Sequence, residues 1–306
     1  MMTRVSADAP WLIKGDRSSV MSRLDPFLLL KRKRKAIDWG SPWLFFFQVY
    51  ASTWIFLIPI ALAGRTLLSN PLVLAVVGIS MIADEIFAVL NAYQMQKMAG
   101  LRDFFGRAID PRRISLGWYA VIFLSQPVLM GLALLTHLAL GGTMPSLETP
   151  ARFLANPLSL LPFAGFILIY GPLIEELGWR GYVLDRLQLR YNAVVSSLIL
   201  GFFWGAWHLP LFFIQGTHQS EKMGSMVLFI VGTILYSVLM TWIYNNNNRS
   251  TLSAILVHFM INFTGEFFNF PVAVKNYTLV WVALWALVVI AVWRPGRLSR
   301  LPVRAP

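Results

Sequence analysis

Long apolar stretches follow one another along the chain, separated by short polar segments. There are eight of them, at residues 42–63, 71–95, 115–140, 162–184, 193–214, 225–244, 251–270 and 277–293. Each is close to the ~20 residues that a helix needs to cross a bilayer, although the last, with 17, is short. The pattern predicts an all-α polytopic membrane protein with about eight transmembrane helices in one bundle.

The composition supports this pattern. Hydrophobic residues make up 57% of the chain and charged residues only 13%, against about a quarter charged in soluble domains. Short linkers favour one membrane domain at 42–293, flanked by a basic arm at 1–41 and a basic tail at 294–306. Residues 141–161 are expected to form an outer loop, and the four asparagines at 245–248 a polar turn.

The distribution of basic residues orients the bundle. With the N-terminus inside, the cytoplasmic segments hold 22 of the 26 Lys and Arg residues, counting Arg180 with the loop at 185–192 that it borders. The opposite side holds only Arg65, Arg152, Lys222 and Lys275. Because cytoplasmic loops of membrane proteins carry the excess of Lys and Arg, we expect both termini to be cytoplasmic.

The formal net charge of +12 needs no nucleic acid to explain it. The run Lys31-Arg32-Lys33-Arg34-Lys35 comes just before the first span, where anionic headgroups attract each basic side chain by about 1 kcal/mol. We therefore expect this run to bind anionic lipids and expect no nucleic-acid partner. Residues 1–40 are too charged to be a signal peptide. The chain has no cysteine, which excludes disulfides and a thiolate nucleophile.

Polar side chains inside the spans are the candidates for function, because such residues are costly in lipid. They form three groups, on the fourth, fifth and seventh spans: Glu175, Glu176 and Arg180; Trp204 and His208; His258 and Asn262. The last two groups are pairs spaced i, i+4, so each pair shares one helix face. Counted from the cytoplasmic ends, Glu175, His208 and His258 lie at depths of roughly 10 to 23 Å, so a common level is compatible with the sequence.

Two prolines accompany these groups. Pro172 precedes Glu175 by three residues, and Pro210 follows His208 by two. Each proline removes an amide donor and leaves a carbonyl unpaired one turn earlier, at Leu168 and Ala206. Such a position is either a kink for packing or the lining of a polar cavity, since unpaired backbone is tolerated in a membrane only against protein or water.

The three groups carry a resemblance to a known family. The sequence E-E-L-G-W-R-G, then W-x-x-x-H, then H-x-x-x-N resembles the CAAX-prenyl-protease and bacteriocin-processing family of intramembrane proteases, which includes abortive-infection-type proteins. That family has E-E-x-x-x-R, F-x-x-x-H and H-x-x-x-N or H-x-x-x-D on separate helices, so Trp204 replaces the usual Phe while keeping an aromatic wall. The resemblance covers about 160–270 and implies an integral protein of a bacterial cell membrane that hydrolyses peptide bonds.

Amide hydrolysis assigns a role to each residue that matches the family. It requires a base to activate water, a donor for the oxyanion and a proton for the leaving amine. We expect Glu175 to be the base, with His208 helping to hold the water, and His258 and Asn262 to point their N–H groups at one oxygen. Glu176 and Arg180 form an i, i+4 pair in the favourable order and are expected to orient the neighbouring carboxylate.

Metal dependence is open on the sequence alone. Glu175, His208 and His258 could bind Zn²⁺ with one position left for water, and the family is often labelled metalloprotease, yet a glutamate-activated water needs no metal. We favour no tightly bound metal. The sequence has neither H-E-x-x-H nor a G-x-S-G serine motif.

The polar cluster is also compatible with functions that need no catalysis. It could serve a non-catalytic immunity or scaffold protein, or an ion or solute carrier; a membrane-associated or lipid-anchored peptide is the expected partner of the peptidase. His137 and His218 fall near or beyond the outer boundary and are not expected to act. Asp84 and Glu85, near the middle of the second span, are expected to support the structure or line the cavity.

Overall fold

In a computed structural model of the chain, the described residues are 37–67, 70–222, 224–293 and 296–299. These residues form helices and no strand. Eight of their helical segments are long and apolar enough to cross a membrane, which confirms the predicted all-α polytopic membrane fold. The described residues from Trp39 onward belong to one compact unit. The basic run at 31–35 lies outside the described residues, as do most of the predicted arm and tail.

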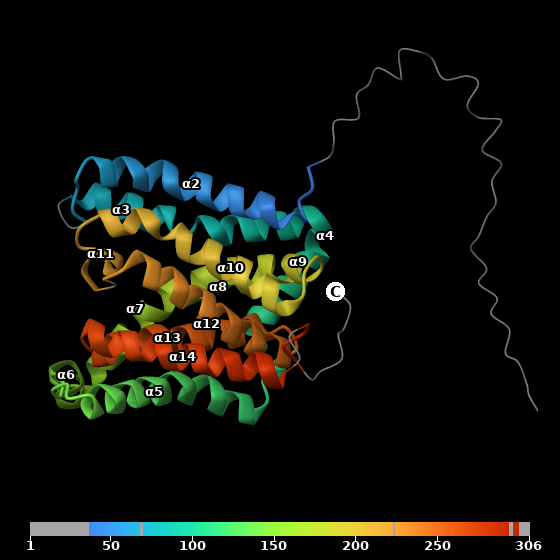
Figure 1. The fold of residues 1–306 in the computed structure, drawn as a ribbon. Helices are drawn as coiled ribbons and strands as arrows, with labels where there is room; N and C mark the ends of the chain where they lie inside the picture. Colours follow the sequence, from blue (N-terminus) through green and yellow to red (C-terminus); the bar gives the residue numbers. More distant parts are fainter. Residues whose placement is uncertain (1–36, 68–69, 223, 294–295, 300–306) are drawn as a thin grey trace, which may run out of the picture. The chain divides into compact units, whose positions relative to one another are not determined.

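The helices follow the apolar stretches along the chain (Figure 1). In chain order they are α2 (Pro42–Leu62), α3 (Pro71–Ser80), α4 (Ala83–Ile109), η2 (Pro111–Arg113), α5 (Leu116–Ala139), α6 (Glu148–Ala155), η3 (Pro157–Ser159), α7 (Leu160–Leu168), η4 (Ile169–Leu173), α8 (Ile174–Gly178), η5 (Trp179–Val183), α9 (Leu184–Gln188), α10 (Ala193–Trp207), η6 (Leu209–Phe213), α11 (His218–Lys222), α12 (Met226–Asn246), α13 (Thr251–Phe268) and α14 (Val272–Val292). The η labels mark 3₁₀- and π-helical turns.

Three spans differ from the prediction. The fourth runs from Pro157 to Gln188 instead of 162–184, so it includes the end of the expected outer loop and the start of the expected loop at 185–192. The second span breaks at Met81 and Ile82 and continues as α4 to Ile109, with a kink at Lys97 (φ 51°, ψ −137°). The predicted span ended at residue 95, so the chain between the second and third predicted spans is helical as far as Ile109. The last span begins at Val272 and has 21 residues instead of 17. Its first turns include Lys275, whose long apolar stem can lie along the bilayer while the ammonium group reaches the interface. The hydrophobic pattern therefore underestimated spans whose ends carry charge.

The middle of the bundle is formed by α10 and α12, which make the most extensive helix pair among the described residues. Figure 1 shows the two lying side by side, with α2 and α4 on one side of them and α13, α14 and α5 on the other. A G-x-x-x-G sequence allows this close approach: a Cβ at Gly201 would lie 2.5 Å from Ile234 Cα, and one at Gly205 would lie 2.3 Å from Thr233 Oγ1. Small residues at this spacing are typical of packed membrane helices.

The fourth span is the least regular helix of the fold. Its α-helical pieces alternate with two π-helical turns, η4 and η5, and Tyr170 departs from helical geometry (φ −85°, ψ 22°). Pro172 lies inside η4, where its missing N–H removes a helical hydrogen bond. Wide turns of this kind occur frequently at functional sites, because they rotate the following side chains relative to a regular helix. Glu175 and Glu176 come immediately after the first of these turns.

Candidate active site

Four elements bring the predicted site residues together. The short helix α8 carries Glu175 and Glu176, η5 carries Arg180, α10 and its cap carry Trp204 and His208, and α13 carries His258 and Asn262. All but Asn262 are buried, and Asn262 is half-buried. The depths estimated from the sequence allowed these groups to share a level, and their hydrogen bonds and ring contacts show that they do.

Glu175 has two oxygens in different surroundings. Its Oε2 accepts a 2.6 Å hydrogen bond from Nε1 of Trp204. Its Oε1 accepts no hydrogen bond from the residues that the structure describes, and it lies 3.9 Å from Nε2 of His208. The residue is 8% exposed, so this carboxylate is shielded while one of its oxygens is left available. Trp204 therefore does more than provide the aromatic wall expected from the sequence, because the Phe typical of the family has no N–H to donate.

His208 is held in one orientation by the end of its own helix. Its Nδ1 lies 2.9 Å from the backbone oxygen of Trp204. Since a carbonyl oxygen can only accept, Nδ1 carries the hydrogen, and the neutral ring presents the lone pair of Nε2 to Glu175. Two acceptors 3.9 Å apart can both receive hydrogen bonds from one water molecule. The geometry at Glu175 and His208 thus suits the binding of a water.

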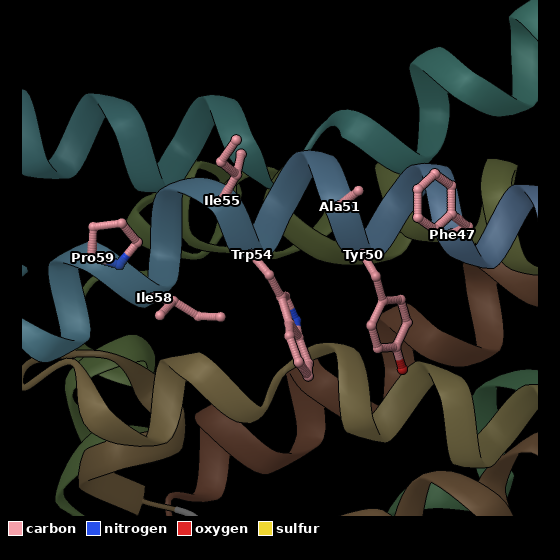
Figure 2. Close-up of a pocket in the computed structure, with 7 residues that line it drawn as sticks. All are labelled: Phe47, Tyr50, Ala51, Trp54, Ile55, Ile58 and Pro59. Atoms are coloured by element: carbon pink, nitrogen blue, oxygen red, sulfur yellow. The ribbon is translucent and has the colours of Figure 1, made fainter.

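The end of α10 is supported from outside by α2. Pro210 ends the α-helix and begins the 3₁₀ turn η6, which leaves carbonyls of the last turn without helical partners. Tyr50 Oη donates to the oxygen of Phe203, and Trp54 Nε1 donates to that of Trp207 at 3.0 Å. Figure 2 shows both side chains pointing from α2 toward the neighbouring helix, at the rim of an apolar surface groove of about 470 Å³.

A chain of hydrogen bonds runs from Arg180 to Asn262. Oε1 of Glu176 accepts from Nη1 of Arg180 at 2.8 Å and from Nδ1 of His258 at 2.9 Å. Because the carboxylate accepts, the hydrogen of a neutral His258 is on Nδ1, and its Nε2 must accept from Nδ2 of Asn262 at 3.2 Å. The amide of Asn262 is therefore oriented by this chain and retains one further N–H. In this arrangement His258 has no free N–H of its own, which differs from the role expected from the sequence.

The ring of Trp204 joins the two halves of the site. The guanidinium carbon of Arg180 lies 4.7 Å from the centre of the Trp204 ring, and the ring of His258 lies 5.1 Å from it, edge-on. A guanidinium over an indole face is attracted by the ring's quadrupole. The Trp204 side chain thus contacts Arg180, which is bonded to Glu176, and also donates a hydrogen bond to Glu175.

The remaining polar residues singled out in the sequence lie outside this cluster. Asp84 and Glu85 occupy the first turn of α4 rather than the middle of a continuous helix, because the helix restarts there and its unpaired N–H groups favour acidic side chains. Asp84 is fully buried and packs against Gly178 of the site helix. His137 Nε2 bonds the oxygen of Thr143, and His218 Nδ1 lies 2.8 Å from Glu266. Both histidines thus have partners away from the site.

The side chains do not form a three-ligand metal site. In the described part of the chain, no three His, Asp or Glu side chains are gathered in a way that could hold a metal ion. Glu175 and His208 face each other, but Nδ1 of His258 is directed at Glu176 and its Nε2 at Asn262. A zinc ion would need one of these nitrogens as a ligand, so the donor set considered from the sequence does not fit zinc in this arrangement.

A second buried cluster, which the sequence pattern did not reveal, lies further along the fourth span. Asp185 accepts hydrogen bonds from Arg107, Tyr244 and Arg249, which come from α4, α12 and the turn before α13. Burial alone would lower the pKa of Arg249, but its hydrogen bonds to Asp185 and the negative charge of that residue raise it. Asp185 follows Arg180 by five residues and could have been recognised as an acid in an apolar helix, but its arginine partners are 64 and 78 residues away.

Comparisons with known proteins agree with the motifs. Residues 157–264 match the model of the type II CAAX prenyl endopeptidase Rce1-like family. The chain is also 26% identical over 230 residues to CAAX prenyl protease 2 of Methanococcus maripaludis, in an alignment that covers 74% of this chain and 84% of that protein. The segment matched by the family model contains every residue of the candidate active site, from Glu175 to Asn262.

Proposed function

Because the chain belongs to the CAAX-prenyl-protease and bacteriocin-processing family and is a membrane protease, we propose that it hydrolyses a peptide bond at or within the membrane with a water activated by Glu175. The observation that carries this proposal is the pairing of two free acceptors, Glu175 Oε1 and His208 Nε2, 3.9 Å apart, beside the oriented amide of Asn262. An acceptor pair beside a hydrogen-bond donor is what attack of water on a carbonyl requires.

In the first step a water donates its hydrogens to Glu175 Oε1 and His208 Nε2. Glu175 takes one proton as the oxygen of the water bonds to the carbonyl carbon of the substrate. The carbonyl oxygen gains the negative charge, and the remaining N–H of Asn262 donates to it. Glu175 then gives its proton to the leaving nitrogen, the C–N bond breaks, and an acid and an amine are released. The hydrogen bond from Trp204 to Oε2 leaves Oε1 as the oxygen that exchanges the proton.

In this mechanism Glu176, Arg180 and His258 position the oxyanion donor. One oxygen of Glu176 accepts hydrogen bonds from both Arg180 and His258, so the orientation of His258 depends on this carboxylate. His258 in turn holds the Asn262 amide. A donor placed before the reaction begins needs no reorganisation when charge develops, and removal of one such donor typically lowers kcat by about 10²–10³-fold.

We propose a lipid-anchored peptide as the substrate, with a prenylated C-terminal peptide as the first candidate. The relative in Methanococcus maripaludis carries the name CAAX prenyl protease 2. The fourth span exposes apolar side chains just before Glu175, including Phe166, Ile169 and Tyr170, so that side of the site faces lipid. A peptide held at the bilayer by its own lipid can reach the site from that side.

The proposal is tested by single-turnover cleavage in liposomes of a farnesylated C-terminal peptide and its unprenylated counterpart. We expect the wild-type protein to cleave the farnesylated peptide and Glu175→Gln to lose about 10²–10⁴-fold in rate, because Gln keeps the size of the side chain but cannot take a proton. Thermal unfolding of both proteins in detergent controls for folding. Near-normal cleavage by the variant would exclude Glu175 as the base.

Two further measurements distinguish this mechanism from a metal-dependent one and from a non-catalytic function. Activity that is lost with a chelator and restored by Zn²⁺ would require a rearranged His258 and a metal mechanism. A wild-type protein that binds the peptide without cleaving it would favour the non-catalytic scaffold or carrier function. We expect cleavage that is insensitive to the chelator.

A further inference from the structure

The space beside Gly171 is bordered by two reacting groups. A Cβ placed on this residue would lie 3.4 Å from Nδ2 of Asn262 and 3.8 Å from Oε1 of Glu175. Apart from its chain neighbours and the backbone of its own helix, no other atom of the described residues comes within 4 Å of that position. The proposed oxyanion donor and the proposed base therefore both border the space left by the missing side chain of Gly171, which we call the opening.

Packing does not explain this glycine. At Gly201 and Gly205 an added Cβ would come within 2.5 Å of the atoms of α12, so those glycines are required by the contact between helices. Distances of 3.4 and 3.8 Å at Gly171 are ordinary van der Waals contacts, which an alanine could make without displacing its neighbours. The backbone of Gly171 does not require glycine either, because its φ is not positive.

The position of Gly171 places this opening on the path of a substrate that arrives from lipid. Gly171 lies in the π-helical turn η4. Tyr170, its neighbour, is 70% exposed, and Leu173 is also exposed, whereas Gly171 itself is buried. The helix thus has a lipid-facing side at this turn and presents Gly171 to the interior. A peptide that passes this turn toward Glu175 meets Gly171 beside the bond to be cleaved.

We infer that Gly171 is a specificity-determining residue, whose missing side chain leaves room for the substrate chain next to the scissile bond. This inference rests on the proposed function, because it takes Glu175 and Asn262 as the groups that face the reacting carbonyl. Substrates with a large residue beside the scissile bond need this room most, while substrates with glycine or alanine there need less of it.

The test uses a series of farnesylated peptides that differ only in the residue beside the scissile bond, which is located by mass spectrometry. The residue is Gly, Ala, Leu or Phe, and kcat/KM is measured for wild type and Gly171→Ala in liposomes. We expect Gly171→Ala to lose at least about tenfold in kcat/KM for Leu and Phe relative to Gly, since one extra methylene-sized group in a substrate site changes discrimination by about 10–200-fold. If the ratios between the kcat/KM values of the four peptides were the same for Gly171→Ala as for wild type, the inference would be overturned.

Gly165→Ala is the matched control, because an added Cβ there meets nothing within 4 Å and the residue lies six positions earlier in the same span. This variant should keep the wild-type ratios. Both variants should unfold at or above the wild-type temperature, as alanine favours helix over glycine. If Glu175→Gln still cleaves the series, the proposed function fails; if cleavage depends on Glu175 but Gly171→Ala keeps the wild-type ratios, only the inference about Gly171 fails. If the wild type cleaves none of the peptides, both fail.

Discussion

Two buried charge clusters lie on the fourth span, and they differ in how completely their polar atoms are bonded. Both oxygens of Asp185 accept two hydrogen bonds each, from Arg107, Tyr244 and Arg249. In the cluster of Glu176 and Arg180, by contrast, Oε2 of the carboxylate and Nε and Nη2 of the guanidinium have no partner among the described residues. Buried polar groups without partners are expensive.

The difference separates a structural cluster from a functional one. The groups around Asp185 connect α4, α9, α12 and the turn before α13, and the bonds to its carboxylate are complete in the folded chain. Arg180 and His258 each donate one hydrogen bond to the same oxygen of Glu176, and this cluster lies beside Glu175, whose Oε1 accepts no hydrogen bond from the described residues. Unlike the cluster around Asp185, this cluster is linked to the proposed reacting groups, through His258 to the amide of Asn262 and through the Trp204 ring to Glu175. The first cluster should therefore govern stability and the second activity as well as stability, which variants can separate.

The largest expected effect is on folding, from Asp185→Asn. This change leaves Arg107 and Arg249 without the carboxylate that joins them, and removal of one partner from a buried ion pair typically costs about 3–5 kcal/mol. We expect a large fall in the unfolding temperature in detergent and near-normal kcat in the protein that remains folded. Asp103→Asn is the control, because Asp103 also bonds Arg107 but is 50% exposed, and exposed pairs contribute about 0–1 kcal/mol. Equal effects of the two variants would contradict a structural role specific to Asp185.

Unlike Asp185→Asn, Glu176→Gln should lower activity, and it should also lower stability because it removes the charge partner of the fully buried Arg180. Gln retains an acceptor but loses the charge that holds Arg180 and orients His258. A hydrogen bond to a charged group contributes about 1.5–3 kcal/mol, which corresponds to a fall in kcat of about 10–100-fold. The measurement is single-turnover cleavage, with Glu148→Gln on the exposed helix α6 as the control. A variant with wild-type kcat and a lowered unfolding temperature would place Glu176 with the structural cluster.

A smaller effect is expected for Trp204→Phe, which restores the residue typical of the family. The variant loses the 2.6 Å bond to Glu175 but keeps an aromatic ring beside Arg180 and His258. Because this bond exists in the ground state and in the transition state, only the change in its strength affects the rate. We expect kcat to fall by less than about tenfold. Trp54→Phe, which removes an indole N–H bonded to the backbone of the same helix, controls for loss of a hydrogen bond. A loss as large as that of Glu175→Gln would make Trp204 essential.

The smallest effect on activity and stability is expected from two single-cysteine variants, which test on which side of the membrane the helix ends near each cluster lie. The chain has no cysteine, so Arg112→Cys and Ser146→Cys each introduce a single thiol at an exposed position. If the loop with Arg112 is cytoplasmic, a membrane-impermeant thiol reagent should label the Ser146→Cys variant in intact cells and the Arg112→Cys variant only after permeabilisation. Activity and unfolding temperature should not change. If the Arg112→Cys variant were labelled in intact cells and the Ser146→Cys variant only after permeabilisation, the expected topology would be wrong.

Much of the fold could be predicted from the sequence. The spans follow from the free energy of transferring each residue to lipid, which depends on the residue itself and little on its neighbours. The same property identified Glu175, His208 and His258 as candidates, because polar residues inside a span are unusual wherever the other helices lie. The break at Met81 and the extra length of α14 were missed. Charged residues lie inside the helix next to each of them, Asp84 and Glu85 in α4 and Lys275 in α14, and hydropathy alone does not show how a helix continues through such residues.

The bonds within the site were decided only by the tertiary structure. A hydrogen bond depends on positions to a few tenths of an ångström, whereas hydropathy places a helix only to within a turn or so. The sequence could thus bring His258 and Asn262 to one face but not show that His258 accepts from Asn262. It could not reveal that Gly171 borders Glu175 and Asn262, because that depends on the rotation of two helices 91 residues apart. Residue identity determines what enters the membrane, and helix rotation and tilt determine what meets inside it.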